Sequence, residues 1–400
     1  MSLRSVVCLV ALCVLLSACG KNYTRRLPEG QRALRKITDP RRIPDFRPAY
    51  GDRAGLENAI AQSLFYLEHP SSEHYFPYLE ITHDRAVRSL ESFKALLNTA
   101  ASPDDLQRQI VNQFDVYESV GCDDRGTVLF TGYCTPIYRA SLKPTDEYRY
   151  PLYKLPDDLV KGEKGEVIGR KTSTGIVPYF TRRELESSRR LAGLELVYLR
   201  DRLEAYLVHV QGSAKLELPD GSTFEVGYAG TNGHEYKSLR EMLINDRKLR
   251  AEKASLIGIK EYFRQHPEDL DVYLPRNDRF VFFQQTAGGP FGSLGVPVTA
   301  MRSIATDKTG SKEIYPRSCL AFIQTKLPRM TDRGTVDKAS YSGFILDQDT
   351  GGAIRSAGRA DVYMGVGPIA ERLAGHTVAE GKIYYIFVKE ALLQPPRSAM

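Results

Sequence analysis

Residues 349–367 read DTGGAIRSAGRADVYMGVG, and this stretch decides how the rest of the chain is interpreted. Its five glycines let the backbone turn tightly and let a ligand approach closely, because glycine carries no side chain. Two aspartates, Asp349 and Asp361, lie 12 positions apart within it. Carboxylates beside such a loop indicate an acid–base site, and a glycine-rich turn with solvated aspartates is the alternative.

Outward from this loop, the chain is predicted to be mainly β with helices. Alternating apolar residues predict a hairpin over 216–228, and the alternation of Tyr206, Val208 and Val210 predicts one more strand. Helical spacing predicts three helices between residues 56 and 114, and helix again over 238–266. Since helices and strands do not alternate regularly, two β-barrels are favoured over a βαβ sandwich. Further runs with strand character are 280–283, 318–324, 341–346 and 383–388.

The composition excludes several classes of protein. Of the 400 residues, 42% are hydrophobic and 26% charged, which is typical of a globular chain and not of a disordered or coiled-coil protein. The 55 basic and 49 acidic residues give a net charge of +6, far below that of a nucleic-acid-binding surface, so no nucleic acid partner is expected. The seven histidines are scattered and no cysteine spacing fits zinc, so neither a metal nor a cofactor is expected.

The first residues predict a secreted, lipid-anchored protein. Arg4 precedes an apolar run from Val6 to Leu16, which is too short for a permanent membrane helix. The following Leu-Ser-Ala-Cys-Gly is similar to a bacterial lipobox, which predicts a signal peptide over 1–18 and lipid on Cys19, although an ordinary signal peptide is the alternative. The two residues after Cys19 are Gly20 and Lys21, and neither is the aspartate that commonly retains lipoproteins at the inner membrane. An outer-membrane anchor facing the periplasm is therefore favoured. Residues 19–53, rich in Arg and Pro without periodicity, are expected to be a tether.

Three cysteines remain in the folded body, at positions 122, 134 and 319. In an oxidising compartment, Cys122 and Cys134 are able to pair across a hairpin. The spacing favours this disulfide no more than it favours three buried free thiols.

The segment around Asp349 resembles the three-aspartate (3D) domain of the membrane-bound lytic murein transglycosylase A (MltA) family. The family pattern contains three aspartates, which Asp307, Asp349 and Asp361 match here. Other stretches match in the family's order between about residues 127 and 389, namely 131–136, 210–213, 228–234, 279–283 and 295–299.

Apart from a spacing between Asp349 and Asp361 that is a residue longer than in some relatives, the chain departs from the family pattern at two places. Cys134 stands where a tyrosine is common, and Arg355-Ser356 replaces the usual Lys-Gly. The second departure leaves open whether the loop keeps the family's backbone conformation.

The resemblance implies a double-psi β-barrel with a second, smaller β-barrel inserted, and a glycan cleft between them. The catalytic domain would comprise residues 54–136 and 237–400, with the three-aspartate segment at about 296–389. The inserted barrel would comprise residues 137–236.

The resemblance also implies a peptidoglycan lytic transglycosylase that acts on glycan strands and leaves 1,6-anhydromuropeptides; partner proteins stay open. Asp361 would be the catalytic acid and base, because the sugar's own C6 hydroxyl replaces water as nucleophile. Asp349, Asp307 and Thr135 would support the cleft. The residues expected to bind substrate are Tyr133, Gln211, Gly212, Ser213, Asn232, His234 and Tyr363.

Two other functions are compatible with parts of the sequence. A non-catalytic peptidoglycan-binding lipoprotein needs no acid, and the presence of Asp361 argues against it. An aspartic protease would use the triplet Asp349-Thr350-Gly351, but a bilobal protease needs two such triplets and this chain has one. For His234, a structural role is as compatible with the sequence as sugar binding.

Overall fold

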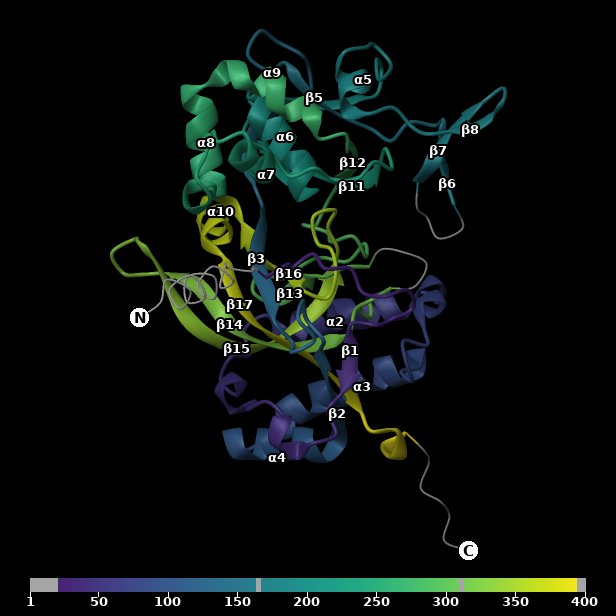
Figure 1. Ribbon diagram of the computed structural model, residues 1–400, viewed down its shortest axis with the longest axis vertical. Helices are drawn as coiled ribbons and strands as arrows, with labels where there is room; N and C mark the ends of the chain where they lie inside the picture. The colour runs from purple at the N-terminus through teal and green to yellow at the C-terminus, as the bar shows by residue number, and fades with distance from the viewer. Residues whose placement is uncertain (1–20, 163–166, 309–312, 394–400) are drawn as a thin grey trace, which may run out of the picture.

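The computed structural model describes residues 21–162, 167–308 and 313–393, and these fold into two β-rich parts (Figure 1). The predicted signal peptide and the predicted lipid site at Cys19 lie outside the described residues. In the described part of the chain, every helix is too short or too polar to cross a membrane.

The lower part in Figure 1 is a closed barrel with helices beneath it. Its elements are β1 (Leu34–Lys36), η1 (Pro40–Arg42), η2 (Arg47–Ala49), α2 (Leu56–Leu67), η3 (Pro70–Tyr75), α3 (His83–Thr99), α4 (Pro103–Gln113), β2 (Phe114–Ser119), β3 (Val128–Thr135), β13 (Ser303–Ala305), β14 (Leu320–Met330), β15 (Val336–Asp349), β16 (Arg359–Val366), α10 (Gly367–His376), β17 (Val378–Val388) and η7 (Glu390–Leu392).

Six strands close this barrel in the order β17-β14-β15-β13-β16-β3, and β3 pairs with β17 to complete the ring. β16 runs parallel to β3 and β13 runs parallel to β15, while the other pairs are antiparallel. This arrangement agrees with the predicted double-psi barrel. The three predicted helices α2, α3 and α4 are present, and α4 begins where Ser102 accepts a hydrogen bond from the backbone N–H of Asp105.

The upper part is the insertion between β3 and β13. Its elements are β4 (Ile137–Ser141), β5 (Tyr150–Tyr153), β6 (Leu159–Lys161), β7 (Val167–Thr172), β8 (Gly175–Val177), α5 (Arg182–Glu186), β9 (Glu195–Leu199), α6 (Arg202–Gln211), β10 (Ala214–Glu217), β11 (Thr223–Thr231), α7 (Leu239–Asn245), η4 (Ala251–Lys253), α8 (Leu256–Gln265), η5 (Pro267–Asp269), α9 (Leu270–Tyr273), η6 (Leu274–Arg276) and β12 (Val281–Thr286).

The insert contains a six-stranded sheet in the order β12-β11-β10-β4-β9-β5, whose outer strands β12 and β5 contact each other. The predicted hairpin is formed by β10 and β11, and strands β6, β7 and β8 form a separate small sheet. Because β12 pairs with β11, the insert sheet extends to Thr286. The predicted end of the inserted domain at residue 236 is therefore too early.

The strand predicted from Tyr206, Val208 and Val210 is wrong. The segment with Tyr206 and Val208 is helix α6, which Asp201 caps by accepting from the backbone N–H of Glu204. Apolar side chains on opposite sides of this helix pack into two different cores, so its residues show no clear helical stripe. Strand-like alternation at three positions was therefore misleading.

The expected tether over residues 19–53 is also wrong for most of its described part. Leu34 and Lys36 lie in β1, which pairs with β2, and the Phe46 ring packs against Phe322 in the barrel core with centroids 4.7 Å apart. A three-residue strand and single buried side chains produce no periodic pattern, because their partners lie far along the chain.

Candidate active site at the junction of the two parts

Asp361 lies in the first half of β16, opposite Thr131 of β3 and Ala305 of β13. Its side chain is 18% exposed. The Thr131 hydroxyl donates a hydrogen bond to Asp361 Oδ1, and Arg359 Nη2 lies 3.7 Å from the same oxygen. Arg359 Nη2 also donates to Thr131 Oγ1 at 3.1 Å. Asp361 is therefore placed by its own strand and two neighbouring strands, and within the described part of the chain it has one close donor, the Thr131 hydroxyl.

The surroundings of Asp361 keep part of its carboxyl protonated near neutral pH. Burial raises the pKa of Asp361 to about 6, Arg359 opposes this rise, and Asp349 adds to it. With that pKa, about a tenth of the carboxyls carry a proton at pH 7. An aspartate at its ordinary pKa would carry almost none, so the site favours proton donation.

Asp349 ends β15 and is held by backbone donors. Its Oδ1 accepts hydrogen bonds from the N–H groups of Ser293, at 2.7 Å, and Thr350, at 2.8 Å. Burial raises the pKa of Asp349. The loop that carries Ser293 lies so close to β15 that a Cβ at Gly292 would be 2.7 Å from the Gln348 carbonyl oxygen. Position 292 therefore requires glycine.

Asp307 fixes the loop that follows Asp349. Its Oδ2 accepts from the backbone N–H of Ser356 at 2.7 Å, and Arg355 Nη1 lies 3.8 Å from its Oδ1. Ser356 has φ of +72°, in the left-handed region that glycine adopts without cost. The chain therefore has a left-handed residue at the position where the family pattern has glycine.

Thr135, Tyr133 and Tyr363 pack together between the two parts. The Thr135 hydroxyl is 2.9 Å from the Tyr363 hydroxyl and 3.3 Å from that of Ser213, which lies in the insert. The Tyr133 and Tyr363 rings are 5.1 Å apart. Tyr363 is 2% exposed, so it cannot offer an open face to a sugar and instead supports its neighbours. Of the two tyrosines expected to bind substrate, Tyr133 is the one whose side chain is partly exposed.

The Tyr133 hydroxyl is buried and makes no hydrogen bond of ordinary geometry with any residue that the structure describes. It lies near the carboxyl of Asp349, which together with burial raises the pKa of Tyr133. Tyr133 is therefore a neutral hydroxyl group beside the carboxylates of the site.

The remaining predicted binding residues divide into two groups. Gln211 and Gly212 end α6 at the junction, where Gln211 Oε1 accepts from the backbone N–H of Cys134 at 3.3 Å. Asn232 and His234 instead hold the insert together. His234 Nε2 is 2.8 Å from the Tyr179 carbonyl oxygen.

Asn232 illustrates why a polar residue in a matching motif need not bind ligand. Its amide donates to the carbonyls of Phe180 and Asp278 at 2.8 and 2.7 Å, and its Oδ1 accepts from the backbone N–H of Phe280 at 2.8 Å. At 2% exposure it has no face toward a ligand. We therefore assign Asn232 a structural role and not the predicted binding role.

Sequence reasoning missed four residues around the aspartates. Three of them, Thr131, Arg279 and Arg359, lie in or beside stretches that match the family pattern. The sequence therefore marked these positions but did not show which residues they contact. Ser293 contributes only a backbone N–H, which any residue other than proline would supply.

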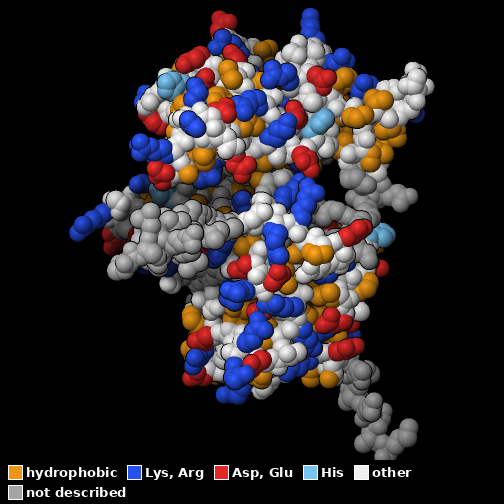
Figure 2. All heavy atoms as spheres, in the orientation of Figure 1, with side chains coloured by type: hydrophobic (Ala, Val, Ile, Leu, Met, Phe, Trp, Pro, Cys, Tyr) orange, Lys and Arg blue, Asp and Glu red, His pale blue; other side chains and the backbone are white. Residues whose placement is uncertain are grey.

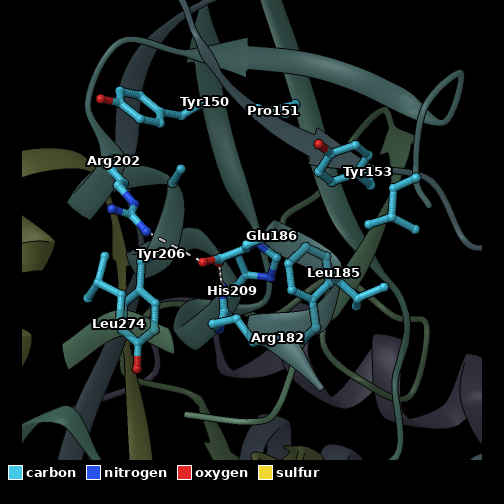
Figure 3. Close-up of a pocket in the computed structure, with 13 residues that line it drawn as sticks. Tyr150, Pro151, Tyr153, Arg182, Leu185, Glu186, Arg202, Tyr206, His209 and Leu274 are labelled. Carbon is cyan, nitrogen blue, oxygen red and sulfur yellow. Dashed lines mark hydrogen bonds and ion pairs between the residues drawn. The ribbon is translucent and has the colours of Figure 1, made fainter. Parts of the chain in front are cut away.

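A pocket of about 260 Å³ lies within the insert, away from Asp361 (Figure 3). At its wall the Arg182 guanidinium lies 4.9 Å from the ring centroids of both Tyr206 and Phe280, and it pairs with Glu186. None of the predicted site residues lines this pocket.

The cysteines Cys122, Cys134 and Cys319 are buried free thiols. Among the described residues, no cluster of His, Cys, Asp and Glu has the geometry to hold a metal.

Comparison with known proteins identifies the family. Residues 129–284 match the MltA specific insert domain, and residues 302–387 match the 3D domain. Membrane-bound lytic murein transglycosylase A from Vibrio cholerae is 32% identical over 279 residues, which cover 69% of this chain and 70% of that protein. The chain belongs to the MltA family. The MltA protein of Escherichia coli K12 is 28% identical over 275 residues, covering 68% of this chain and 69% of that protein.

Solved MltA structures share the fold. The membrane-bound lytic murein transglycosylase from Agrobacterium tumefaciens superposes with a TM-score of 0.74 at 26% identity, over 90% of this chain and 99% of that one. E. coli MltA with bound chitohexaose gives a TM-score of 0.64 at 22% identity, over 92% and 97% of the two chains. The family and fold predictions from the sequence are confirmed.

Proposed function

We propose that this MltA-family chain cleaves the β-1,4 bond between N-acetylmuramic acid and N-acetylglucosamine in peptidoglycan, leaving a 1,6-anhydromuramic acid end. The observation that carries the proposal is the environment of Asp361. Its carboxyl is mostly buried, has one close hydroxyl donor, and has a pKa raised to about 6. Family membership supplies the substrate class, and this carboxyl supplies the chemistry.

In the proposed reaction, Asp361 acts twice. Its carboxyl protonates the glycosidic oxygen as the bond from that oxygen to C1 of muramic acid breaks. The resulting carboxylate then accepts the C6 hydroxyl proton while the C6 oxygen bonds to C1, so the acid is regenerated without water. A hydrolytic glycosidase needs a second carboxylate for water or for a covalent intermediate, and here the substrate replaces it.

Asp349 and Asp307 have positioning roles in this proposal. Asp349 is bonded to two backbone N–H groups, and its negative charge raises the pKa of Asp361. Asp307 is bonded to the backbone N–H of Ser356 and holds the loop between the other two aspartates. Neither therefore needs to exchange a proton with the substrate.

Mass spectrometry of released muropeptides tests the proposed activity. The protein without residues 1–18 is incubated with purified sacculi, and the products are examined for 1,6-anhydromuramic ends. Anhydro products are expected. Reducing muramic acid ends would mean that water is the nucleophile, and binding without release would favour the non-catalytic lipoprotein. Cleavage of peptide bonds by Asp349 would favour the protease.

The proposed location is the outer membrane, with Cys19 carrying the lipid and the folded chain facing the periplasm. The motif before Cys19 and the membrane-bound name of the relatives support this proposal. Fractionation of a Cys19→Ala variant tests it, because loss of the acyl chains should release the protein from the membrane. A Cys19→Ala protein that stays wholly in the membrane fraction would contradict it.

A further inference from the structure

Two arginines lie on the two sides of the contact between the insert and the loop after Asp349. Arg279 precedes β12 of the insert, and Arg355 belongs to the loop that Asp307 fixes. A Cβ at Gly352 would lie 3.1 Å from Arg279 Nε, so this guanidinium lies directly against the loop. Figure 2 shows Lys and Arg side chains spread over the face in view, with one group of them at the junction between the two parts.

Arg279 has few partners of its own. Its only side-chain hydrogen bond among the described residues goes to the His234 carbonyl oxygen at 3.4 Å, and no described carboxylate pairs with it. The nearby acid Glu235 lies 3.7 Å from Arg26 instead. Burial and the Arg355 charge lower the pKa of Arg279, as expected for a cation that lacks an anion.

Arg355 also has unused donors. Its Nη1 lies 3.8 Å from Asp307, beyond hydrogen-bond distance, and this buried nitrogen has no hydrogen-bond partner among the described residues. Two adjacent guanidinium groups repel each other, and each carries five N–H donors. Such a pair is stabilised when a carboxylate accepts from both.

We infer that Arg279 and Arg355 together bind a carboxylate on the muramic acid substituent of the substrate, and so select glycan that carries muramic acid. The inference rests on the proposed function. Muramic acid bears a lactyl group at C3, which ends in a carboxylate or continues into the stem peptide with its own carboxylates.

The test measures binding, not turnover, so that it stands apart from the proposed reaction. Asp361→Asn protein serves as the background, with and without Arg279→Gln, Arg355→Gln or both. Three soluble ligands are compared: glycan with stem peptides, the same glycan after the peptides are removed by an amidase, and neutral chitohexaose. Arg329→Gln is the matched control, because Arg329 is an exposed arginine on β14.

We expect Arg279→Gln to weaken binding of muramic acid glycan roughly ten- to a hundredfold, while chitohexaose binding stays unchanged. Loss with peptide-bearing glycan alone assigns the carboxylate to the stem peptide, and loss with the peptide-free glycan alone assigns it to the free lactyl group. Loss with both glycans shows that the pair accepts either carboxylate. Arg279→Lys should restore part of the affinity. Equal losses for chitohexaose and glycan, or no loss for either glycan, would overturn the inference.

Failure of the proposed function gives a different result. A wild-type protein that releases no anhydro product, yet loses glycan affinity through Arg279→Gln, would refute cleavage and leave the carboxylate site standing. Unfolding curves of each variant check that the arginine substitutions leave the fold intact.

Discussion

Two aspartates of the same barrel differ in how their charge is satisfied. Asp347, in β15, is fully buried, pairs with Lys308, and accepts from Thr306 at 2.7 Å and Tyr385 at 2.6 Å. Asp361 is 18% exposed and has one close hydroxyl donor, with Arg359 at 3.7 Å. Burial raises the pKa of both. A carboxylate whose partners are complete holds the structure, whereas one with fewer partners is free to exchange a proton.

The largest stability effect is expected at Asp347. Asp347→Ala leaves the buried Lys308 charge without its partner and should lower the free energy of unfolding by about 3–5 kcal/mol. Urea denaturation followed by circular dichroism measures this. Asp347→Leu combined with Lys308→Met removes both charges and should recover much of the loss. A single substitution that costs under about 1 kcal/mol would contradict a structural role for this pair.

Asp361→Asn should raise the free energy of unfolding, whereas Asp347→Ala should lower it. The folded pKa of about 6 lies above the unfolded value near 3.8, so the folded state binds more protons between these pH values. Stability contributed by this group is therefore present below about pH 4 and is lost as pH rises through about 6. At pH 7, Asp361→Asn should stabilise the protein by up to about 3 kcal/mol. The gain should vanish at pH 4, and equal changes at both pH values would contradict the raised pKa.

Arg359 should set the pH at which activity is lost. Because the acid must be protonated, kcat/KM is expected to fall as pH rises above about 6. Arg359 lowers the pKa of Asp361, so Arg359→Gln should move this alkaline limb upward by about one pH unit. The pH dependence of kcat/KM, measured for both proteins on soluble glycan, tests this shift. A limb that moves downward would show that Arg359 does not act through its charge.

The smallest effect is expected at the contact between the two parts. Thr135→Val removes the hydroxyl that bonds to Tyr363 and Ser213, and should cost about 1 kcal/mol. Thermal unfolding measures the change. A double-mutant cycle with Ser213→Ala should show coupling, since the two hydroxyls are 3.3 Å apart. Strict additivity would indicate that this contact is not formed in solution.

The sequence was sufficient for elements whose pattern is local. The hairpin of β10 and β11, the three helices between residues 56 and 114, and the two aspartates of the glycine-rich loop were all identified. These features depend on neighbours within a few residues, so their signals lie in short stretches of chain.

Features set by distant contacts were missed. Helix α6 lies between two cores and so lacks a stripe, while β1 pairs with a strand far along the chain. Asn232 was assigned to substrate because a motif does not say which way a side chain faces. Arg279 comes against the loop that carries Arg355 only after the insert folds onto the barrel. Charge patterns along the chain cannot show such a pair.

The central claim is that Asp361, and not Asp349, exchanges the proton. The most direct measurement compares the release of anhydromuropeptides by Asp361→Asn and Asp349→Asn, with both variants shown to be folded by circular dichroism. We predict that Asp361→Asn lowers turnover by at least about a thousandfold while glycan binding persists, and that Asp349→Asn retains substantially more activity. Near-normal release by Asp361→Asn, with release abolished in folded Asp349→Asn, would contradict the account.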